Sequence, residues 1–154
     1  GDTVVEITGD CPILDTEVAS QVISLYEHSD VKYASNAHIR SYPDGMDVQV
    51  FSLNSLIESE KMTSNTLHRE HVSLHMRENP KLFPQANLLA PPSLHHPELG
   101  LTLDEIEDFK LLKLIIENLY PQSPLFSCQD IMRFLKKNPA FVKINESVKR
   151  KGDT

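Results

Sequence analysis

Two aspartates that lie far apart in the sequence each follow a short apolar segment, and together they could bind a metal ion. Asp10 comes just after the β-branched segment Val4–Thr8, and Asp104 comes just after Leu101–Leu103. Runs of this kind favour strands. A carboxylate just past the carboxyl end of a strand lies where open α/β sheets bind their ligands. Two such carboxylates on neighbouring strand ends could hold one hard divalent cation against a phosphate.

Each aspartate also has a purely structural explanation. Asp104 precedes a helical pattern and could cap that helix, with Glu107 completing a capping box. Asp10 lies in a Gly-Asp-Cys-Pro segment and could serve only to form a turn. The spacing of the two residues leaves both explanations open.

Length, composition and charge limit the classes of protein to which this chain can belong. Its 154 residues, 40% hydrophobic and 24% charged, suit a single domain at 1–154, with 149–154 as a solvated basic tail. The net charge is −7, and residues 1–60 carry eleven acids against two bases. Such an acidic half argues against a nucleic-acid-binding groove, which needs a positive field.

The sequence also predicts that the protein works in the cytoplasm without a membrane partner. No apolar stretch approaches the roughly 20 residues that span a bilayer, and no secretory signal is visible at the start. Cys11 and Cys128 share no metal-ligand spacing and are too few for a disulfide framework, so we expect both to be reduced.

Alternating strand and helix patterns predict an α/β fold with a mixed sheet. Strands are expected at 3–8, 31–35, 46–51 and 99–103, and helices at 15–28, 53–62, 65–78, 105–119 and 129–137. Asp15 and Ser127 are expected to cap the first and the last of these helices. The first strand is apolar enough to be central and covered on both faces. Its cover must then come from residues missing from this chain or from another copy of it.

The strongest helical pattern lies at 105–119. Its first turn is acidic and lysines follow, as the helix dipole favours. One apolar stripe is predicted to face the core, made of Ile106, Phe109, Leu112, Ile115, Ile116 and Leu119.

An ordered set of motifs covers residues 3 to 146, which is nearly the whole chain. The set consists of Ile7-Thr8-Gly9-Asp10-Cys11-Pro12-Ile13-Leu14-Asp15, Tyr33-x-Ser35-Asn36, Arg40-x-Tyr42-Pro43-Asp44-Gly45-Met46-Asp47-Val48-x-Val50-Phe51, Arg69-Glu70-His71-Val72 and Leu103-Asp104-x-x-Glu107-Asp108-Phe109. Together these motifs resemble the carboxyl-terminal two-thirds of the cytidylyltransferase family that includes spore coat polysaccharide biosynthesis protein F. That family is related to acylneuraminate and deoxyoctulosonate cytidylyltransferases.

The resemblance implies a three-layer α/β/α sandwich with a mixed, mostly parallel sheet, similar to glycosyltransferase-A domains. It implies a nucleotidyltransferase that couples a sugar or sugar acid to CTP, releases pyrophosphate and serves surface polysaccharide biosynthesis. It further implies that Asp10 and Asp104 are the catalytic carboxylates that bind Mg²⁺. The ion would neutralise phosphate charge while a sugar hydroxyl attacks in line.

Polar residues around Gly45 are the first candidate substrate contacts. The resemblance implies that Arg40, Tyr42, Asp44 and Asp47 face the hydroxyls of the acceptor sugar. Gly45 would let the backbone approach the ligand closely. The same Pro-Asp-Gly segment is also typical of a hairpin turn with surface charges, so both interpretations stay open.

A second group of candidates lies in the helix expected at 65–78. The resemblance implies that Arg69 faces a phosphate or carboxylate of the substrate and that Glu70 orients Arg69. The alternative is an ordinary polar helix face, with Val72 and Met76 buried on the other side.

Three histidines on the same expected helix suggest another kind of site. His68, His71 and His75 would share one helix face, which is a spacing found in zinc sites. A catalytic zinc site needs a further ligand or an open coordination position, and the sequence shows neither. A transition-metal protein is therefore a minor alternative.

The sequence departs from the family pattern in two places. A basic nucleotide-binding signature of the Arg-x-x-Ser-x-Arg-Leu-Pro-x-Lys type is missing, so the chain is expected to be incomplete at its N-terminus and inactive as this fragment. Leu101 stands where the family usually has an aromatic residue. The alternative function is a non-catalytic interaction module derived from this fold, which forms a homodimer through the edge of its first strand.

Overall fold

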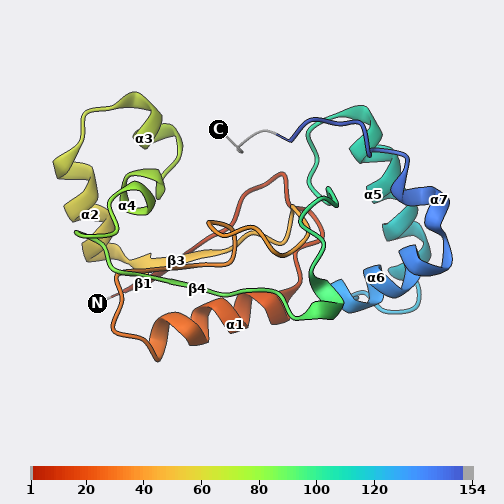
Figure 1. Ribbon diagram of the computed structural model, residues 1–154, viewed down its shortest axis with the longest axis horizontal. Helices are drawn as coiled ribbons and strands as arrows, with labels where there is room; N and C mark the ends of the chain where they lie inside the picture. Colours follow the sequence, from red (N-terminus) through yellow and green to blue (C-terminus); the bar gives the residue numbers. More distant parts are fainter. Residues whose placement is uncertain (1, 151–154) are drawn as a thin grey trace.

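A four-stranded mixed sheet lies at the centre of the computed structural model, which describes residues 2–150 (Figure 1). Its strands are β1 (Thr3–Glu6), β2 (Tyr33–Ser35), β3 (Gln49–Ser52) and β4 (Gln85–Asn87). The helices are α1 (Thr16–Glu27), α2 (Leu53–Met62), α3 (Thr66–Glu70), α4 (Leu74–Glu78), the 3₁₀ turn η1 (Pro92–Leu94), α5 (Ile106–Leu119), α6 (Cys128–Lys137) and α7 (Pro139–Val142). Among the described residues, no helix is both long and apolar enough to cross a membrane.

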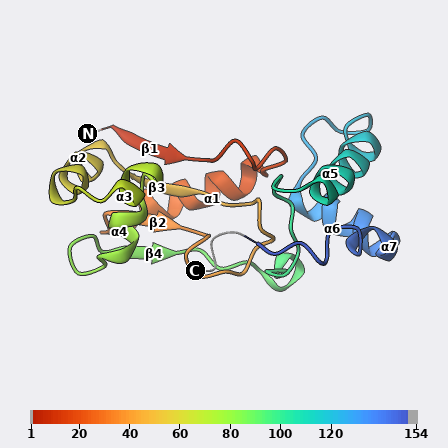
Figure 2. The same ribbon diagram turned by 90° about the horizontal axis from the view of Figure 1, so that it is seen from above.

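The strands lie side by side in the order β1-β3-β2-β4, as Figure 2 shows. β2 and β4 pair in parallel, whereas β3 pairs antiparallel with both β1 and β2. The predicted mixed α/β sheet is confirmed, but two of these three pairings are antiparallel, so the sheet is less parallel than predicted. The connection at 36–48 contains no helix, so β3 returns beside β2 as an antiparallel neighbour and lacks the helical crossover that usually joins parallel strands.

Helices cover both faces of the sheet and give the predicted three layers (Figure 1). On one face, Ala34 and Val50 pack against Val22 of α1. On the other face, Tyr33 and Phe51 pack against Met76 of α4, with Leu56 of α2 beside them. Successive side chains of a strand point to opposite faces, so each strand serves both layers.

A separate core joins α5 and α6 to the loops at one end of the sheet. Its buried members include Ile13, Tyr42, Met46, Leu99, Leu101, Leu111, Ile115, Ile131 and Leu135. One carboxylate, that of Asp15, joins the start of α1 to the start of α6. It accepts hydrogen bonds from Glu17 N at 2.8 Å, which caps α1, and from Cys128 N at 2.8 Å, at the start of α6. The predicted caps at Asp15 and at Ser127 are both confirmed.

Several predicted elements differ from the structure. The strand expected at 99–103 is reduced to one bridge between Asp44 and Gly100. The helix expected at 65–78 is two short helices, α3 and α4, which are separated by a break at 71–73. β1 lies at the edge of the described sheet rather than at its centre, and Val5 is 40% exposed because β1 pairs only with β3 within residues 2–150.

The N-terminal turn of α5 also differs from the prediction. The capping residue is Glu105, and the Asp108 carboxylate accepts the backbone N–H groups of Asp104 and Glu105 at 3.1 and 3.0 Å. The capping box therefore lies one residue later than the predicted Asp104–Glu107 pair. Two members of the predicted apolar stripe are exposed, Ile106 at 60% and Phe109 at 51%, whereas Asp108 is fully buried.

Candidate functional site

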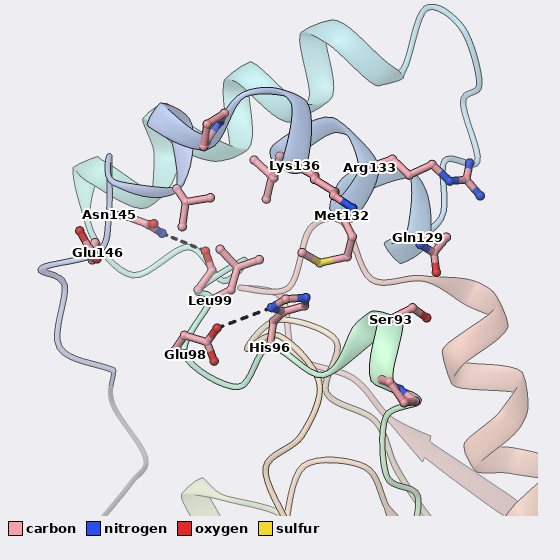
Figure 3. Close-up of a pocket in the computed structure, with 15 residues that line it drawn as sticks. Ser93, His96, Glu98, Leu99, Gln129, Met132, Arg133, Lys136, Asn145 and Glu146 are labelled. Atoms are coloured by element: carbon pink, nitrogen blue, oxygen red, sulfur yellow. Dashed lines mark hydrogen bonds and ion pairs between the residues drawn. The ribbon is translucent and has the colours of Figure 1, made fainter.

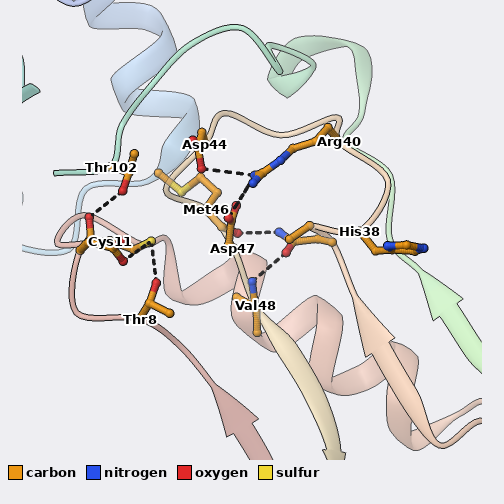
Figure 4. Close-up of polar contacts among 12 residues, drawn as sticks. Thr8, Cys11, His38, Arg40, Asp44, Met46, Asp47, Val48 and Thr102 are labelled. Carbon is orange, nitrogen blue, oxygen red and sulfur yellow. Dashed lines mark hydrogen bonds and ion pairs between the residues drawn. The ribbon is translucent and has the colours of Figure 1, made fainter. Parts of the chain in front are cut away.

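The loops that carry the two predicted metal-binding aspartates are joined by hydrogen bonds (Figure 4). The backbone oxygen of Asp10 accepts from Leu103 N at 2.8 Å and from Thr102 Oγ1 at 3.1 Å. Asp104 is the next residue along the second loop. β1 ends at Glu6, so Asp10 lies just past the carboxyl end of a strand, as predicted. The structure therefore brings together two segments that are more than ninety residues apart in the sequence.

The loop at 36–48 adds two more aspartates and an arginine to this region. Arg40 donates to Asp47 at 3.0 Å and to Asp44 at 3.3 Å (Figure 4). The side chain of Asn36 holds the loop in place, because its Nδ2 donates to Met46 O at 2.6 Å and its Oδ1 accepts from Val48 N at 2.8 Å. The sequence places Asn36 in a motif but predicts no role for it. Only the structure shows that its side chain fixes the loop at 36–48.

The four aspartates make this region strongly negative. Burial and, to a smaller extent, the charge of Asp47 raise the pKa of Asp44 from 3.8 to about 6. Arg40 and Arg150 lower this pKa, whereas Asp104 raises it, which places the Asp104 carboxylate within electrostatic range of Asp44. A cation bound here would relieve that repulsion.

The donor set suits a hard cation that is shared with a substrate. No cluster of three histidine, cysteine or acidic side chains within residues 2–150 is arranged to hold a metal by itself. Mg²⁺ commonly takes only one or two protein carboxylates and completes its shell with water and phosphate oxygens. The residues present, two aspartates on adjacent loops, fit this requirement.

Cys11 follows Asp10 on the same loop but is not activated. Its Sγ is 3.3 Å from Thr8 Oγ1 and 3.7 Å from the Asp10 carboxylate (Figure 4). Burial raises the pKa of the thiol to about 11, and the nearby Asp47 and Asp10 charges act in the same direction. Since the thiolate is the nucleophilic form, this cysteine is not suited to covalent chemistry at neutral pH.

Two of the predicted substrate contacts have structural roles. Tyr42 is 2% exposed and packs in the core beside α5 and α6, so its ring does not face an acceptor. Gly45 has φ of 110°, and a Cβ there would lie 2.5 Å from Leu101 O. Its missing side chain is required by the backbone of Leu101 rather than by a ligand.

Arg69 and Glu70 lie on α3, away from the loops just described. Arg69 pairs with Glu60 of α2 at 2.7 Å, and both side chains are more than half exposed. Glu70 is exposed as well. The structure thus gives Arg69 a partner in α2, and its contact with a substrate stays a prediction.

The three histidines do not form a metal site. The break after Glu70 removes the common helix face, and His71 is exposed at the end of α3. His68 contacts Thr63 at 2.7 Å and Glu78 at 2.9 Å, whereas His75 contacts Ser59 at 2.8 Å. These ring nitrogens already have protein partners, and within residues 2–150 the minor alternative of a metal site on the three histidines is not found.

A buried network behind Asp104 was missed by the sequence reasoning. Asp108 Oδ1 accepts from Asn145 Nδ2 at 2.7 Å and pairs with Arg150 at 2.9 Å. Asn145 also donates to Gly100 O at 2.8 Å. Arg150 was predicted to be part of a solvated tail at 149–154, but its side chain is only 14% exposed. Residues 151–154 of that tail lie outside the described residues.

A cavity of about 800 Å³ lies between the segment 92–100 and helices α6 and α7 (Figure 3). Leu99 and Met132 contribute apolar wall, and the Nδ1 of His96 lies 3.6 Å from the Glu98 carboxylate. Among residues 2–150, none of the predicted site residues lines this cavity. It is therefore separate from the candidate site.

Comparisons with known proteins agree with the resemblance seen in the motifs. No family model matches the sequence. The chain is 32% identical over 151 residues to the uncharacterized protein MJ1063 of Methanocaldococcus jannaschii, covering 98% of this chain and 60% of that protein. It is 29% identical over 139 residues to the spore coat polysaccharide biosynthesis protein SpsF of Bacillus subtilis, covering 88% of this chain and 55% of SpsF.

A solved structure is also similar to this chain. A cytidylyltransferase from Leptospira borgpetersenii matches with a TM-score of 0.84 and 27% identity, over 98% of this chain and 61% of that one. The chain thus spans between 55% and 61% of the length of these three proteins.

Proposed function

Because this chain belongs to the cytidylyltransferase family, we propose that it is part of an enzyme that couples a sugar or sugar acid to CTP and releases pyrophosphate. The observation that carries the proposal is the pair of hydrogen bonds from Leu103 N and Thr102 Oγ1 to Asp10 O, which puts the two acid-bearing loops side by side. The similarity to SpsF supports a role in surface polysaccharide biosynthesis. Both cysteines are free, in keeping with a cytoplasmic location.

Asp10 and Asp104 are the residues proposed to bind Mg²⁺ and to act as the catalytic carboxylates. When bound, the ion supplies charge neutralisation on the phosphates of the nucleotide. Burial, with the charges of Asp47 and Asp104 acting in the same direction, raises the pKa of Asp44 to about 6, and the repulsion among these acids supports a cation at this place. Arg40 holds Asp44 and Asp47 in fixed orientations, so that their remaining oxygen lone pairs can accept hydrogen bonds from acceptor hydroxyls.

Binding of CTP requires more positive charge than this region offers. This region holds four aspartates, Asp10, Asp44, Asp47 and Asp104, against the two arginines Arg40 and Arg150. A triphosphate is repelled by such a field. We therefore propose that residues outside this chain supply the nucleotide clamp and that this chain is inactive alone. Arg69 and Glu70 are proposed to contact the substrate in the full-length protein.

The test uses the full-length protein with Asp10→Asn and Asp104→Asn, each assayed for pyrophosphate release from CTP with a panel of sugars and sugar acids. Loss of a metal-binding carboxylate is expected to lower kcat/KM by about 100-fold or more. Excess Mg²⁺ should restore part of the activity. Asp30→Asn, which changes an exposed acid after α1, is the matched control. Wild-type turnover in either site variant would overturn the metal assignment.

A second candidate function follows from the edge of β1. Val5 is 40% exposed and Ile7 is 57% exposed, and within residues 2–150 this strand has a partner on one side only. An apolar strand edge can pair with another chain, which would make the fragment an interaction module or a homodimer. Light scattering over a range of concentrations tests this function, and a monomer at every concentration argues against it.

A further inference from the structure

The segment 145–150 lies against the loop that carries Asp104. Asn145 is 2% exposed, and its Nδ2 donates to Gly100 O at 2.8 Å (Figure 3) and to Asp108 Oδ1 at 2.7 Å. Gly100 precedes Asp104 by four residues, and Asp108 follows it by four. The side-chain amide of Asn145 therefore joins the two ends of the stretch that contains Asp104.

The side chain of Arg150 packs against both ends of the same stretch. It is 14% exposed, and its Nη1 lies 2.9 Å from Asp108 Oδ1. A Cβ on Gly100 would overlap the guanidinium of Arg150, and no other group lies nearer to that position. The space that the guanidinium occupies therefore depends on the missing side chain at position 100.

Asp108 connects Arg150 to the backbone of Asp104. Its second oxygen, Oδ2, accepts from the backbone N–H groups of Asp104 and Glu105 at 3.1 and 3.0 Å. The Asp108 side chain is fully buried, and an ionised carboxylate is stable in such a place only when it is paired and hydrogen-bonded. Arg150 is the cation that pairs with it. Loss of the guanidinium would therefore weaken the acceptor that holds the Asp104 backbone.

The position of the Asp104 carboxylate depends on this backbone contact. Leu103 N donates to Asp10 O at 2.8 Å, and Asp104 N donates to Asp108, so adjacent backbone bonds hold the loop where the side chain leaves it. A functional side chain must be held within about 0.5 Å of its working position by its supporting groups. Groups that hold a metal ligand in place contribute about 10–100-fold to metal affinity or activity.

The charge of Arg150 also reaches the neighbouring acid loop at 36–48. Gly100, on which the guanidinium packs, forms a backbone bridge with Asp44 of that loop. Burial raises the pKa of Asp44 to about 6, and the charge of Arg150 acts against this rise. One guanidinium thus favours the ionised carboxylates of both Asp44 and Asp108.

We propose that Arg150 is a positioning residue for Asp104, which acts through Asp108 and is supported by Asn145. Its Nη1 is buried, so the residue acts through the protein rather than on a substrate. The segment 145–150 then belongs to the functional site, although it contributes none of the proposed metal-binding groups. This inference rests on the proposed function and deepens it, because it names the contact on which the position of Asp104 depends.

Two variants of the full-length protein remove the contact in different ways. Arg150→Ala removes the guanidinium, whereas Gly100→Ala keeps the arginine but fills its place. Within residues 2–150, Gly45 is the glycine with a positive φ, so alanine at position 100 strains no backbone. Gly100→Ala should have little effect in the Arg150→Ala background, because the new Cβ then has room.

The first measurement is amide hydrogen exchange without metal or substrate, and the second is the Mg²⁺ concentration for half-maximal pyrophosphate release. Each single variant is expected to speed exchange at Asp104 and Glu105 by about tenfold, because the loop opens more often. Each should also raise the required Mg²⁺ concentration by about tenfold.

Two controls separate positioning from a general loss of stability. Lys149→Gln removes an exposed charge from the same segment and should match wild type within about twofold in both measurements. Val22→Ala removes buried volume from the core between α1 and the sheet, so it lowers the stability of the whole fold. It should leave exchange at Asp104 and the Mg²⁺ requirement as in wild type.

The possible results distinguish this inference from the function on which it rests. Wild-type exchange at Asp104 in Arg150→Ala, or faster exchange with an unchanged Mg²⁺ requirement, would overturn the inference and leave the cytidylyltransferase proposal intact. Equal changes in Val22→Ala would also overturn it, since lost stability would then explain them. If exchange responds as expected but CTP is not consumed with any acceptor, the proposed function fails, whereas the positioning of the Asp104 loop by Arg150 is supported.

Discussion

The substitution Asp108→Asn tests the network that holds the Asp104 loop. Asp108 is fully buried, and its two oxygens have four partners. One oxygen accepts the backbone N–H groups of Asp104 and Glu105 at 3.1 and 3.0 Å, and the other meets Asn145 at 2.7 Å and Arg150 at 2.9 Å. Asparagine has nearly the same shape, but it replaces one acceptor oxygen with a donor. Two of the four partners then face an amide that cannot accept from them.

The expected loss of stability follows from these contacts. Removing one member of a buried ion pair costs about 3–5 kcal/mol, because the other charge is left buried without compensation. The Arg150 side chain is 14% exposed and keeps some hydration, so we expect the lower end, about 3 kcal/mol. For a chain of this length, that corresponds to a fall of about 6–12 °C in Tm.

The assay is urea unfolding at a series of pH values. Burial alone would raise the pKa of Asp108, but the hydrogen bonds from Asn145 and from the Glu105 and Asp104 backbone, together with Arg150, lower it below its ordinary value. A lowered pKa in the folded state means that the ionised carboxylate stabilises the fold above about pH 4 and that this contribution disappears as the pH falls through the folded-state pKa. The difference between wild type and Asp108→Asn should therefore shrink in acid.

A double-mutant cycle gives the sharpest result. Arg150→Gln should cost less in the Asp108→Asn background than in wild type, with a coupling energy of about 1 kcal/mol or more. Glu117→Gln, which changes an exposed acid on the same helix, is the control and should stay within about 0.5 kcal/mol of wild type. A loss below about 1 kcal/mol in Asp108→Asn, or no coupling with Arg150, would refute the reasoning.

Three further substitutions test single features of the loops. Gly45→Ala should cost about 2–3 kcal/mol in thermal unfolding, because φ is 110° and the new Cβ meets Leu101 O; a loss under about 1 kcal/mol would contradict this. Asp44→Asn should raise the free energy of unfolding by about 1–2 kcal/mol at pH 8 and leave it unchanged at pH 3. The folded-state pKa of Asp44 is raised to about 6, so ionisation of this group destabilises the wild type as the pH rises from about 4 to about 6. A difference that stays constant across pH would contradict this explanation. Asp15→Ala should cost about 2 kcal/mol in urea unfolding, because one carboxylate caps α1 and bonds the start of α6; a cost typical of an exposed acid would argue otherwise.

Local signals in the sequence were enough to predict most of the helices. The helix at 53–62 has the predicted ends, and the caps at Asp15 and Ser127 make the predicted hydrogen bonds. Each of these features depends on residues within one or two turns of each other. The break between α3 and α4 was missed because the pattern of apolar residues continues across it.

Features that depend on distant residues were not predictable in this way. The position of β3 between β1 and β2 depends on pairings across the whole sheet, and it turned a sheet expected to be mostly parallel into one with two antiparallel pairings. The burial of Asp108 depends on Asn145 and Arg150, which lie 37 and 42 residues later in the sequence. From the sequence alone, Asp108 looked like one more acid in the first turn of a helix.

Four aspartates that look alike in the sequence have two different roles in the structure. Asp15 and Asp108 are buried, and their carboxylates bind backbone N–H groups at helix starts. Asp10 and Asp104 instead contribute their backbones to these contacts. The backbone oxygen of Asp10 joins the two loops, and the backbone N–H of Asp104 donates to the Asp108 carboxylate. Within residues 2–150, neither of their carboxylates binds a backbone N–H. The fold thus uses one pair of acids to fix the loops and leaves the carboxylates of the other pair available to a cation, and only the three-dimensional arrangement tells the two pairs apart.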